Sequence, residues 1–131
     1  MENTHYQNLT RTFARLSRFS HLSAIASWDM FAMMPPAGSA ARGAALAEIG
    51  VLQHQILTDK QVGQWLTAAE QENLNDVERA NLREMQRHYQ QAVLLPESLV
   101  EAKSLAGSKC EHAWRTQRPN NDWEGFSANL K

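Results

Sequence analysis

Residues 19–39 read FSHLSAIASWDMFAMMPPAGS, and this stretch decides the fold. Between Phe19 and Met34 the apolar residues fall on nearly every side of a helix. Because a helix that is apolar all round is buried on all sides, we expect this segment at the centre of something larger. Pro35 and Pro36 then break the helix, and so short a connection predicts an antiparallel hairpin with the next helix.

The rest of the chain also carries helical periodicity and lacks the alternating pattern of strands. The sequence therefore predicts an all-α fold of five to six helices in one helical domain over residues 1–131. We place helices at 4–33, 40–57, 59–71, 76–94 and 96–117, with another starting at 122. The last one opens with Trp123 and Phe126, and the sequence stops soon after them. We therefore expect the chain to be the front of a longer protein.

The expected helix starts carry residues that favour caps and first turns. Predicted N-caps are Ser39, Thr58 and Asp59 together for the third helix, Asp76 and Asp122. Thr58 and Gln61 fit a capping box, and Pro96 is expected in the first turn of the fifth helix. The apolar stripe of that fifth helix comprises Leu99, Ala102, Ala106, Cys110, Ala113 and Trp114.

The composition argues against several classes of function. Thirteen basic residues are balanced by 14 acidic ones, for a net charge of −1, so no surface for nucleic acid or anionic lipid is indicated. The apolar segment is shorter than the roughly 20 residues of a membrane span, and Asp29 interrupts it. Because the first residues lack a signal-peptide pattern and the single Cys110 cannot form an internal disulfide, we expect a cytoplasmic protein.

No complete catalytic or metal site can be assembled from the sequence. None of the five histidines belongs to an H-E-x-x-H motif or has a second histidine three or four residues away. Glu84 and His88 share a helix face but supply two ligands at most. Cys110 lies near His112, but its place in the apolar stripe favours a small core residue. We therefore assign no catalytic, cofactor-binding or metal-binding residue.

Trp28-Asp29 is the most informative dipeptide. Asp29 is the only formal charge between Arg18 and Arg42, and it lies in the most apolar stretch. A buried carboxylate needs a partner. Arg42 follows just after the Pro-Pro turn, so we expect an Asp29–Arg42 ion pair across the hairpin and a structural role for Trp28, Asp29 and Arg42.

Four segments together resemble the carboxypeptidase Taq family of metallocarboxypeptidases. They are Trp28-Asp29 with Met34-Pro35-Pro36-Ala37-Gly38 and Arg42; Leu52-Gln53-His54 with Leu57-Thr58; Leu95-Pro96-Glu97-Ser98-Leu99-Val100; and Ala113-Trp114-Arg115 with Asn121-Asp122-Trp123-Glu124-Gly125-Phe126. No single segment is specific, but their order and spacing resemble the N-terminal region of that family over nearly the whole chain.

The resemblance implies a longer, mostly helical enzyme that releases C-terminal residues from peptides with zinc or another divalent metal. In the family, two histidines of H-E-x-x-H and a downstream glutamate hold the metal, and the glutamate of the motif activates water. The resemblance places all of these residues beyond the region matched here, in a C-terminal catalytic region. The chain would then form the wall and lid of a substrate groove, contain no metal or cofactor site, and be inactive alone.

A second hypothesis is a stand-alone helical module that binds another protein and has no enzymatic activity. The two hypotheses predict different surfaces. A piece of an enzyme exposes a large apolar patch where the catalytic region docks, and it self-associates as a homo-oligomer. A stand-alone module has that surface covered.

Overall fold

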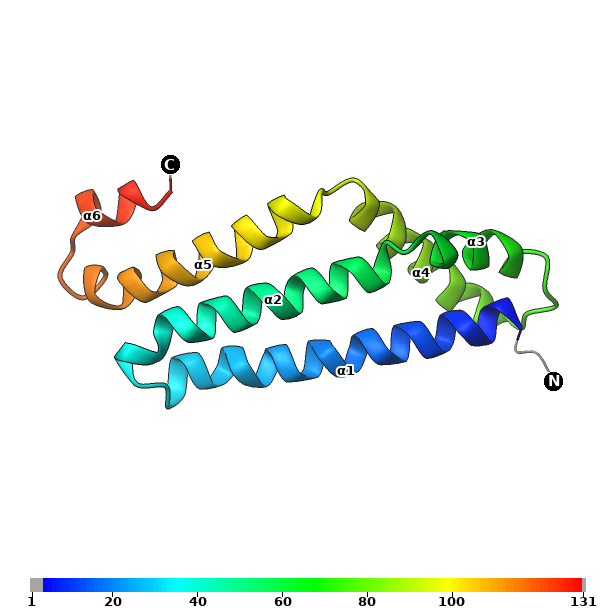
Figure 1. Ribbon diagram of the computed structural model, residues 1–131, viewed down its shortest axis with the longest axis horizontal. Helices are drawn as coiled ribbons and strands as arrows, with labels where there is room; N and C mark the ends of the chain where they lie inside the picture. Colours follow the sequence, from blue (N-terminus) through cyan, green and yellow to red (C-terminus); the bar gives the residue numbers. More distant parts are fainter. Residues whose placement is uncertain (1–3, 131) are drawn as a thin grey trace. The chain divides into compact units, whose positions relative to one another are not determined.

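The computed structural model describes residues 4–130, which form six α-helices and no strand. These are α1 (His5–Ala32), α2 (Ser39–Leu57), α3 (Lys60–Ala69), α4 (Asp76–Val93), α5 (Glu97–Gln117) and α6 (Trp123–Ala128), with a 3-10 turn at Pro36–Gly38 (Figure 1). The all-α prediction is confirmed. The expected single domain over 1–131 stays a prediction, and residues 1–3 and 131 lie outside the described part.

The described residues form two compact units, and α1 and α2 contribute residues to both. Unit 1 consists of residues 4–21 and Leu52–Glu97, and unit 2 of Leu22–Val51 and residues 98–130. The core of unit 1 joins the start of α1 to α3 and α4. It contains Leu9, Val62, Leu66, Ala69, Leu74, Leu82 and Met85, with Tyr6, Phe13, Trp65 and Tyr89 packed against it.

A glycine allows α3 and α4 to approach closely within unit 1. A Cβ atom added at Gly63 would lie 2.5 Å from the hydroxyl oxygen of Tyr89. Any larger residue would therefore push the tyrosine ring away from the core. Gly63 separates the buried residues Val62 and Leu66 on α3 and leaves room for that ring.

The N-terminus of α1 is capped by a carboxylate from a part of unit 1 that is distant in sequence. The first turn of α1 contains no acidic residue. Glu72 supplies the missing carboxylate: its Oε1 accepts hydrogen bonds from the backbone N–H of His5 at 2.7 Å and of Tyr6 at 3.4 Å. A negative charge at this end stabilises the helix, because the unsatisfied N–H groups carry partial positive charge.

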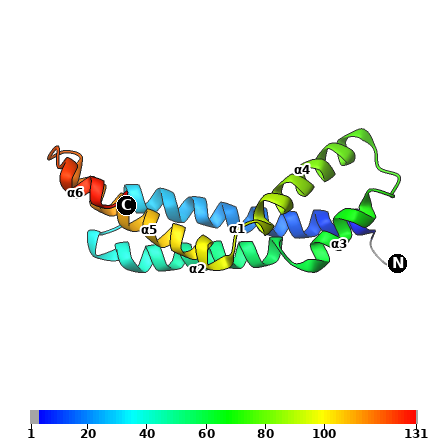
Figure 2. The same ribbon diagram turned by 90° about the horizontal axis from the view of Figure 1, so that it is seen from above.

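Unit 2 contains far less buried apolar surface than unit 1. Its α1–α2 hairpin is antiparallel, as expected, and α5 runs beside α2 (Figures 1 and 2). Among its described residues only Met30, Gly43 and Ala47 are buried. Gly43 marks a close approach, since an added Cβ would lie 3.2 Å from the Cβ of Ser108 on α5. Small residues therefore let the helices of this unit come together without forming a large core.

Much of Phe19–Met34 is exposed in the described part of the chain, in the way that the hypothesis of an enzyme fragment expects. Leu22, Ile25, Trp28, Phe31 and Met33 are each between 51% and 75% exposed. Within unit 2 the neighbouring helices cover only one side of α1, where Met30 is buried. The apolar residues on the other side therefore face solvent in this chain.

The face that α5 turns inward also differs from the expected one. The expected stripe is exposed at Leu99, Ala102 and Ala106, and only half-buried at Cys110. The inward side instead contains half-buried Val100, Ser104, Ser108, Glu111 and Arg115. The close contact at Gly43 favours small and polar residues at this helix interface, which explains why the larger apolar residues point away.

The predicted helix starts at Ser39, Asp76 and Pro96 are each corrected by one residue. Ser39 is the first residue of α2 and has helical φ and ψ angles, so it is not an N-cap. Asn75, and not Asp76, caps α4 in a capping box with Glu78. Of the two residues expected to cap α3, Asp59 does so by accepting a hydrogen bond from Gln61 N–H. Pro96 precedes α5, which starts at Glu97. The predicted cap of α6 is confirmed, because Asp122 accepts from Gly125 N–H at 2.9 Å.

Among the described residues no helix is both long enough and apolar enough to cross a membrane.

Candidate functional site

Arg42 contacts α1 through two hydrogen bonds within unit 2. Its Nη2 lies 2.7 Å from Oδ2 of Asp29, and its Nη1 donates to the carbonyl oxygen of Ala26 at 2.6 Å. The side chains of Asp29 and Arg42 are 32% and 25% exposed, so the carboxylate is half-buried and not at the centre of a core. The pair therefore links α1 to the start of α2 at the edge of the hairpin.

Arg115 binds the C-terminal end of α1 from α5. Its Nη2 donates to the carbonyl oxygen of Met30, its Nε lies 2.8 Å from Oε1 of Glu111, and its guanidinium lies 5.2 Å from the centre of the Phe31 ring. The carbonyl of Met30 is available because Met34 N–H bonds to the carbonyl of Asp29. A cation here is favourable because helix C-termini carry partial negative charge.

The two arginines compensate for a feature that α1 lacks. The last turn of α1 contains no basic residue. Arg42 and Arg115, from two other helices of unit 2, both donate to carbonyl groups in its second half. Sequence reasoning missed Arg115, although the i, i+4 spacing of Glu111 and Arg115 indicates a helical ion pair. No sequence pattern predicts the hydrogen bond from Arg115 to the backbone of α1.

Trp28 does not join this arginine cluster. It is 65% exposed on α1, next in sequence to Asp29 and on the side of the helix away from buried Met30. Of the three residues expected to have a structural role, only two are therefore in contact. Asp29 and Arg42 form a contact, and Trp28 presents its ring to solvent.

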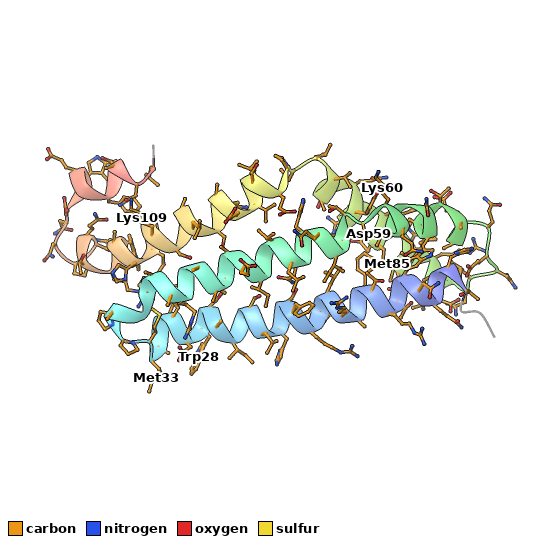
Figure 3. All side chains as sticks on the ribbon, viewed as in Figure 1. Trp28, Met33, Asp59, Lys60, Met85 and Lys109 are labelled. Atoms are coloured by element: carbon orange, nitrogen blue, oxygen red, sulfur yellow. The ribbon has the colours of Figure 1, made fainter. Side chains whose placement is uncertain are left out.

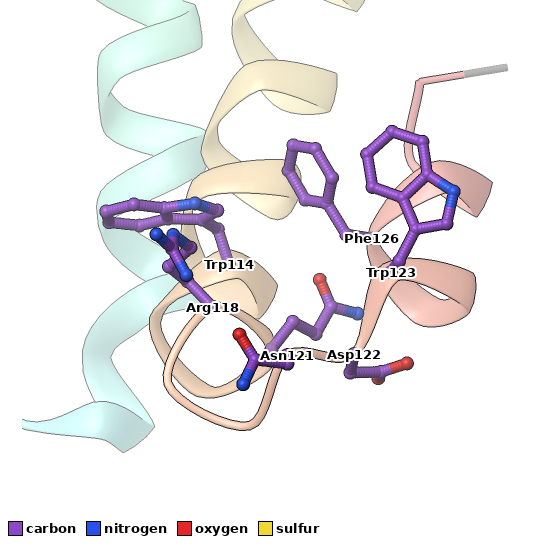
Figure 4. A pocket seen from close by; sticks show the side chains of 7 residues that line it. Trp114, Arg118, Asn121, Asp122, Trp123 and Phe126 are labelled. Carbon is purple, nitrogen blue, oxygen red and sulfur yellow. The ribbon is translucent and has the colours of Figure 1, made fainter.

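A pocket lies between the end of α5 and the start of α6 in unit 2 (Figure 4). Asn121 has a φ of 52° in the connecting turn, and the rings of Trp123 and Phe126 are 5.9 Å apart on α6. The cavity measures about 410 Å³ and is lined by Trp114, Gln117, Arg118, Asn121, Asp122, Trp123 and Phe126. Its lining suits an apolar group, and it contains no pair of side chains that combines a nucleophile with a base.

The described residues contain no group of three or more His, Cys, Asp and Glu side chains that could hold a metal ion. Cys110 is a half-buried free thiol. The candidate functional features of unit 2 are the arginine cluster, the pocket and the exposed side of α1.

Comparison with known proteins identifies the family. The family model of the carboxypeptidase Taq (M32) metallopeptidases matches residues 8–131. The chain therefore belongs to this family of metallopeptidases, which confirms the resemblance seen in the sequence and implies a divalent metal in the full-length family.

Individual relatives are much longer than this chain. Thermostable carboxypeptidase 1 of Thermus thermophilus is 35% identical over 96% of the chain, which covers 26% of that protein. The structure of Trypanosoma cruzi metallocarboxypeptidase 1 matches 97% of the chain with a TM-score of 0.76 and 40% identity, over 26% of its own length. The Pyrococcus furiosus carboxypeptidase structure matches 99% of the chain with a TM-score of 0.75 and 25% identity. The chain thus spans about a quarter of the relatives it matches.

Proposed function

We propose that this member of the carboxypeptidase Taq family forms the N-terminal helical wall and lid of a metallocarboxypeptidase that removes C-terminal residues from peptides. The observation that carries the proposal is the match over residues 8–131, which spans only 26% of the relatives. The metal, proposed to be zinc, would be held outside these residues and would polarise the scissile carbonyl and acidify its bound water. The chain alone would be inactive.

The contacts that tie α1 to α2 and α5 support the proposed role as a wall. A wall excludes folded proteins and admits peptides only if its helices hold their positions. In unit 2, Arg42 and Arg115 tie the second half of α1 to α2 and α5 through contacts with Ala26, Asp29 and Met30. These contacts contribute no proton transfer or metal ligation. Their role in the proposal is to position the helices beside a groove.

A chimeric enzyme tests the proposal. The chain would replace the matching quarter of the Thermus thermophilus carboxypeptidase, and release of the C-terminal residue from a short peptide would be followed with and without a metal chelator. We expect metal-dependent release by the chimera and none by the isolated chain. Release by the isolated chain would contradict its proposed inactivity, and a folded chimera without activity would contradict the assignment to the enzyme.

A stand-alone interaction module would behave differently in the same experiment. It would gain no activity from attachment to a catalytic region, and it would be monodisperse in light scattering. The proposal instead predicts self-association of the isolated chain, because apolar side chains of α1 are exposed in unit 2.

A further inference from the structure

The side of α1 opposite to Met30 forms a continuous apolar ridge, which we call the outer ridge of α1. It consists of Leu22, Ile25, Trp28 and Phe31, which are 56%, 51%, 65% and 62% exposed, and it turns at Phe31 towards α5, where the ring also contacts Arg115. Residues three apart on a helix lie next to one another, so these four side chains form an oblique row within unit 2. Figure 3 shows Trp28, with Met33 beyond the helix end, pointing away from α2.

The outer ridge has the composition of a permanent interface. Asp29 is the only charged residue between Phe19 and Ala41, and its carboxylate is engaged by Arg42. Interface cores are depleted of charged residues and enriched in aromatic residues, and tryptophan is a frequent contributor of binding energy. A transient partner that relies on charge complementarity would find no counterpart here.

The thin core of unit 2 indicates that the ridge needs a cover. Only Met30, Gly43 and Ala47 are buried among the described residues of this unit. A compact unit with so little buried apolar surface is marginally stable by itself. Covering the ridge would add large apolar side chains to that core.

We propose that the outer ridge of α1 is the surface on which the catalytic part of the same peptidase docks through one of its helices. The inference rests on the proposed function, because the occupant is the three quarters of the enzyme that lies outside the match. Ridges of residues three apart pack between rows of residues four apart on a facing helix. The partner is therefore a helix with an apolar face.

The exposed side of α5 is a weaker candidate for the same contact. Its apolar residues include Leu99 and Leu105, but Lys103 and Lys109 lie among them and its other members are mainly alanines. Lysine is depleted at interface cores, and alanine contributes little apolar area. This side of α5 therefore provides a matched control for the outer ridge.

Thiol labelling tests the proposal in the chimeric enzyme described above. Both variants carry Cys110→Ala, so that the native thiol is absent. Trp28→Cys then places a thiol on the outer ridge, and Leu105→Cys places one on α5. The chimera with no added cysteine gives the background labelling. In the isolated chain both thiols should react with a maleimide at similar rates at low protein concentration. In the chimera we expect the thiol at position 28 to react at least about tenfold more slowly, because a covered thiol reacts only after local opening. The thiol at position 105 should keep its rate.

Each result has a separate meaning, and the peptidase activity of the chimera distinguishes the failures. An active chimera with unchanged labelling at position 28 overturns the docking surface and leaves the proposed function intact. A folded but inactive chimera contradicts the proposed function and, with it, the docking surface. Protection at position 28 that disappears on dilution, as dimers dissociate, would assign the ridge to a second copy and overturn the proposal.

Discussion

Replacing Arg115 by methionine tests whether the arginine cluster holds unit 2 together. Methionine retains an unbranched stem and removes three interactions, with Met30, Glu111 and the Phe31 ring. A charged hydrogen bond to a carbonyl contributes about 1.5 kcal/mol, the partly exposed ion pair about 1 kcal/mol and the cation–π contact about 0.5 kcal/mol. Because contributions that share one side chain are not additive, we expect a total loss of about 2 kcal/mol.

Urea unfolding measures this loss. Three of the four tryptophans, Trp28, Trp114 and Trp123, belong to unit 2, so a Trp65→Phe background restricts the fluorescence signal to that unit. The Arg115→Met variant and its parent would be compared in this background. A loss of about 2 kcal/mol corresponds to a melting temperature lower by roughly 8 °C for a chain of this length.

A double-mutant cycle with Glu111→Gln separates the ion pair from the other contacts. The side chains of Glu111 and Arg115 are 19% and 29% exposed, and Oε2 of Glu111 is buried without a hydrogen-bond partner. We expect a coupling energy of about 1 kcal/mol between the two positions. A loss below about 0.5 kcal/mol for Arg115→Met, together with no coupling, would refute the reasoning, because surface substitutions alone reach that size.

Four further substitutions should change the stability of the chain. Asp29→Ala removes the 2.7 Å ion pair and should lower the free energy of unfolding by about 1 kcal/mol, and an unchanged melting temperature would contradict this. Gly63→Ala should lower it by about 1 kcal/mol because the new Cβ displaces the Tyr89 ring, whereas Gly50→Ala, with open space around it, should raise it by about 0.5 kcal/mol, both measured by urea unfolding. Asn75→Ala removes the capping box of α4 and should cost about 1 kcal/mol, with a matching loss of helical circular dichroism at intermediate temperatures.

Local sequence patterns were sufficient to predict the helices and the hairpin turn. Helical periodicity predicted a helix at 76–94, where α4 lies, and the Pro-Pro turn predicted the hairpin, because both depend on residues close in sequence. The exact caps were harder. Asn75 and Asp76 are equally good N-cap residue types, but only Asn75 has a glutamate, Glu78, three residues later to complete a capping box.

The orientation of the helices in unit 2 could not be predicted for a different reason. Apolar periodicity predicts which face of a helix is buried, but it does not identify the element that covers this face. The outward side chains Trp28 and Leu99 follow the apolar pattern and still face solvent within unit 2. The arginine contacts with the carbonyl oxygens of Ala26 and Met30 could not be predicted from the sequence either. Any backbone carbonyl oxygen can accept a hydrogen bond, and no residue type identifies the one that an arginine will bind.

The position of Arg115 at the end of α1 has a consequence for how this helix exchanges its amide hydrogens. Helix ends usually fray, and their amides exchange with solvent fastest. Here the carbonyl of Met30, in the last turn of α1, accepts a hydrogen bond from Arg115 of α5, so we expect this turn to unwind only when that contact is lost. The amides of Met33 and Met34 should therefore exchange as one cooperative unit with the middle of α5, although they lie about 80 residues away along the chain.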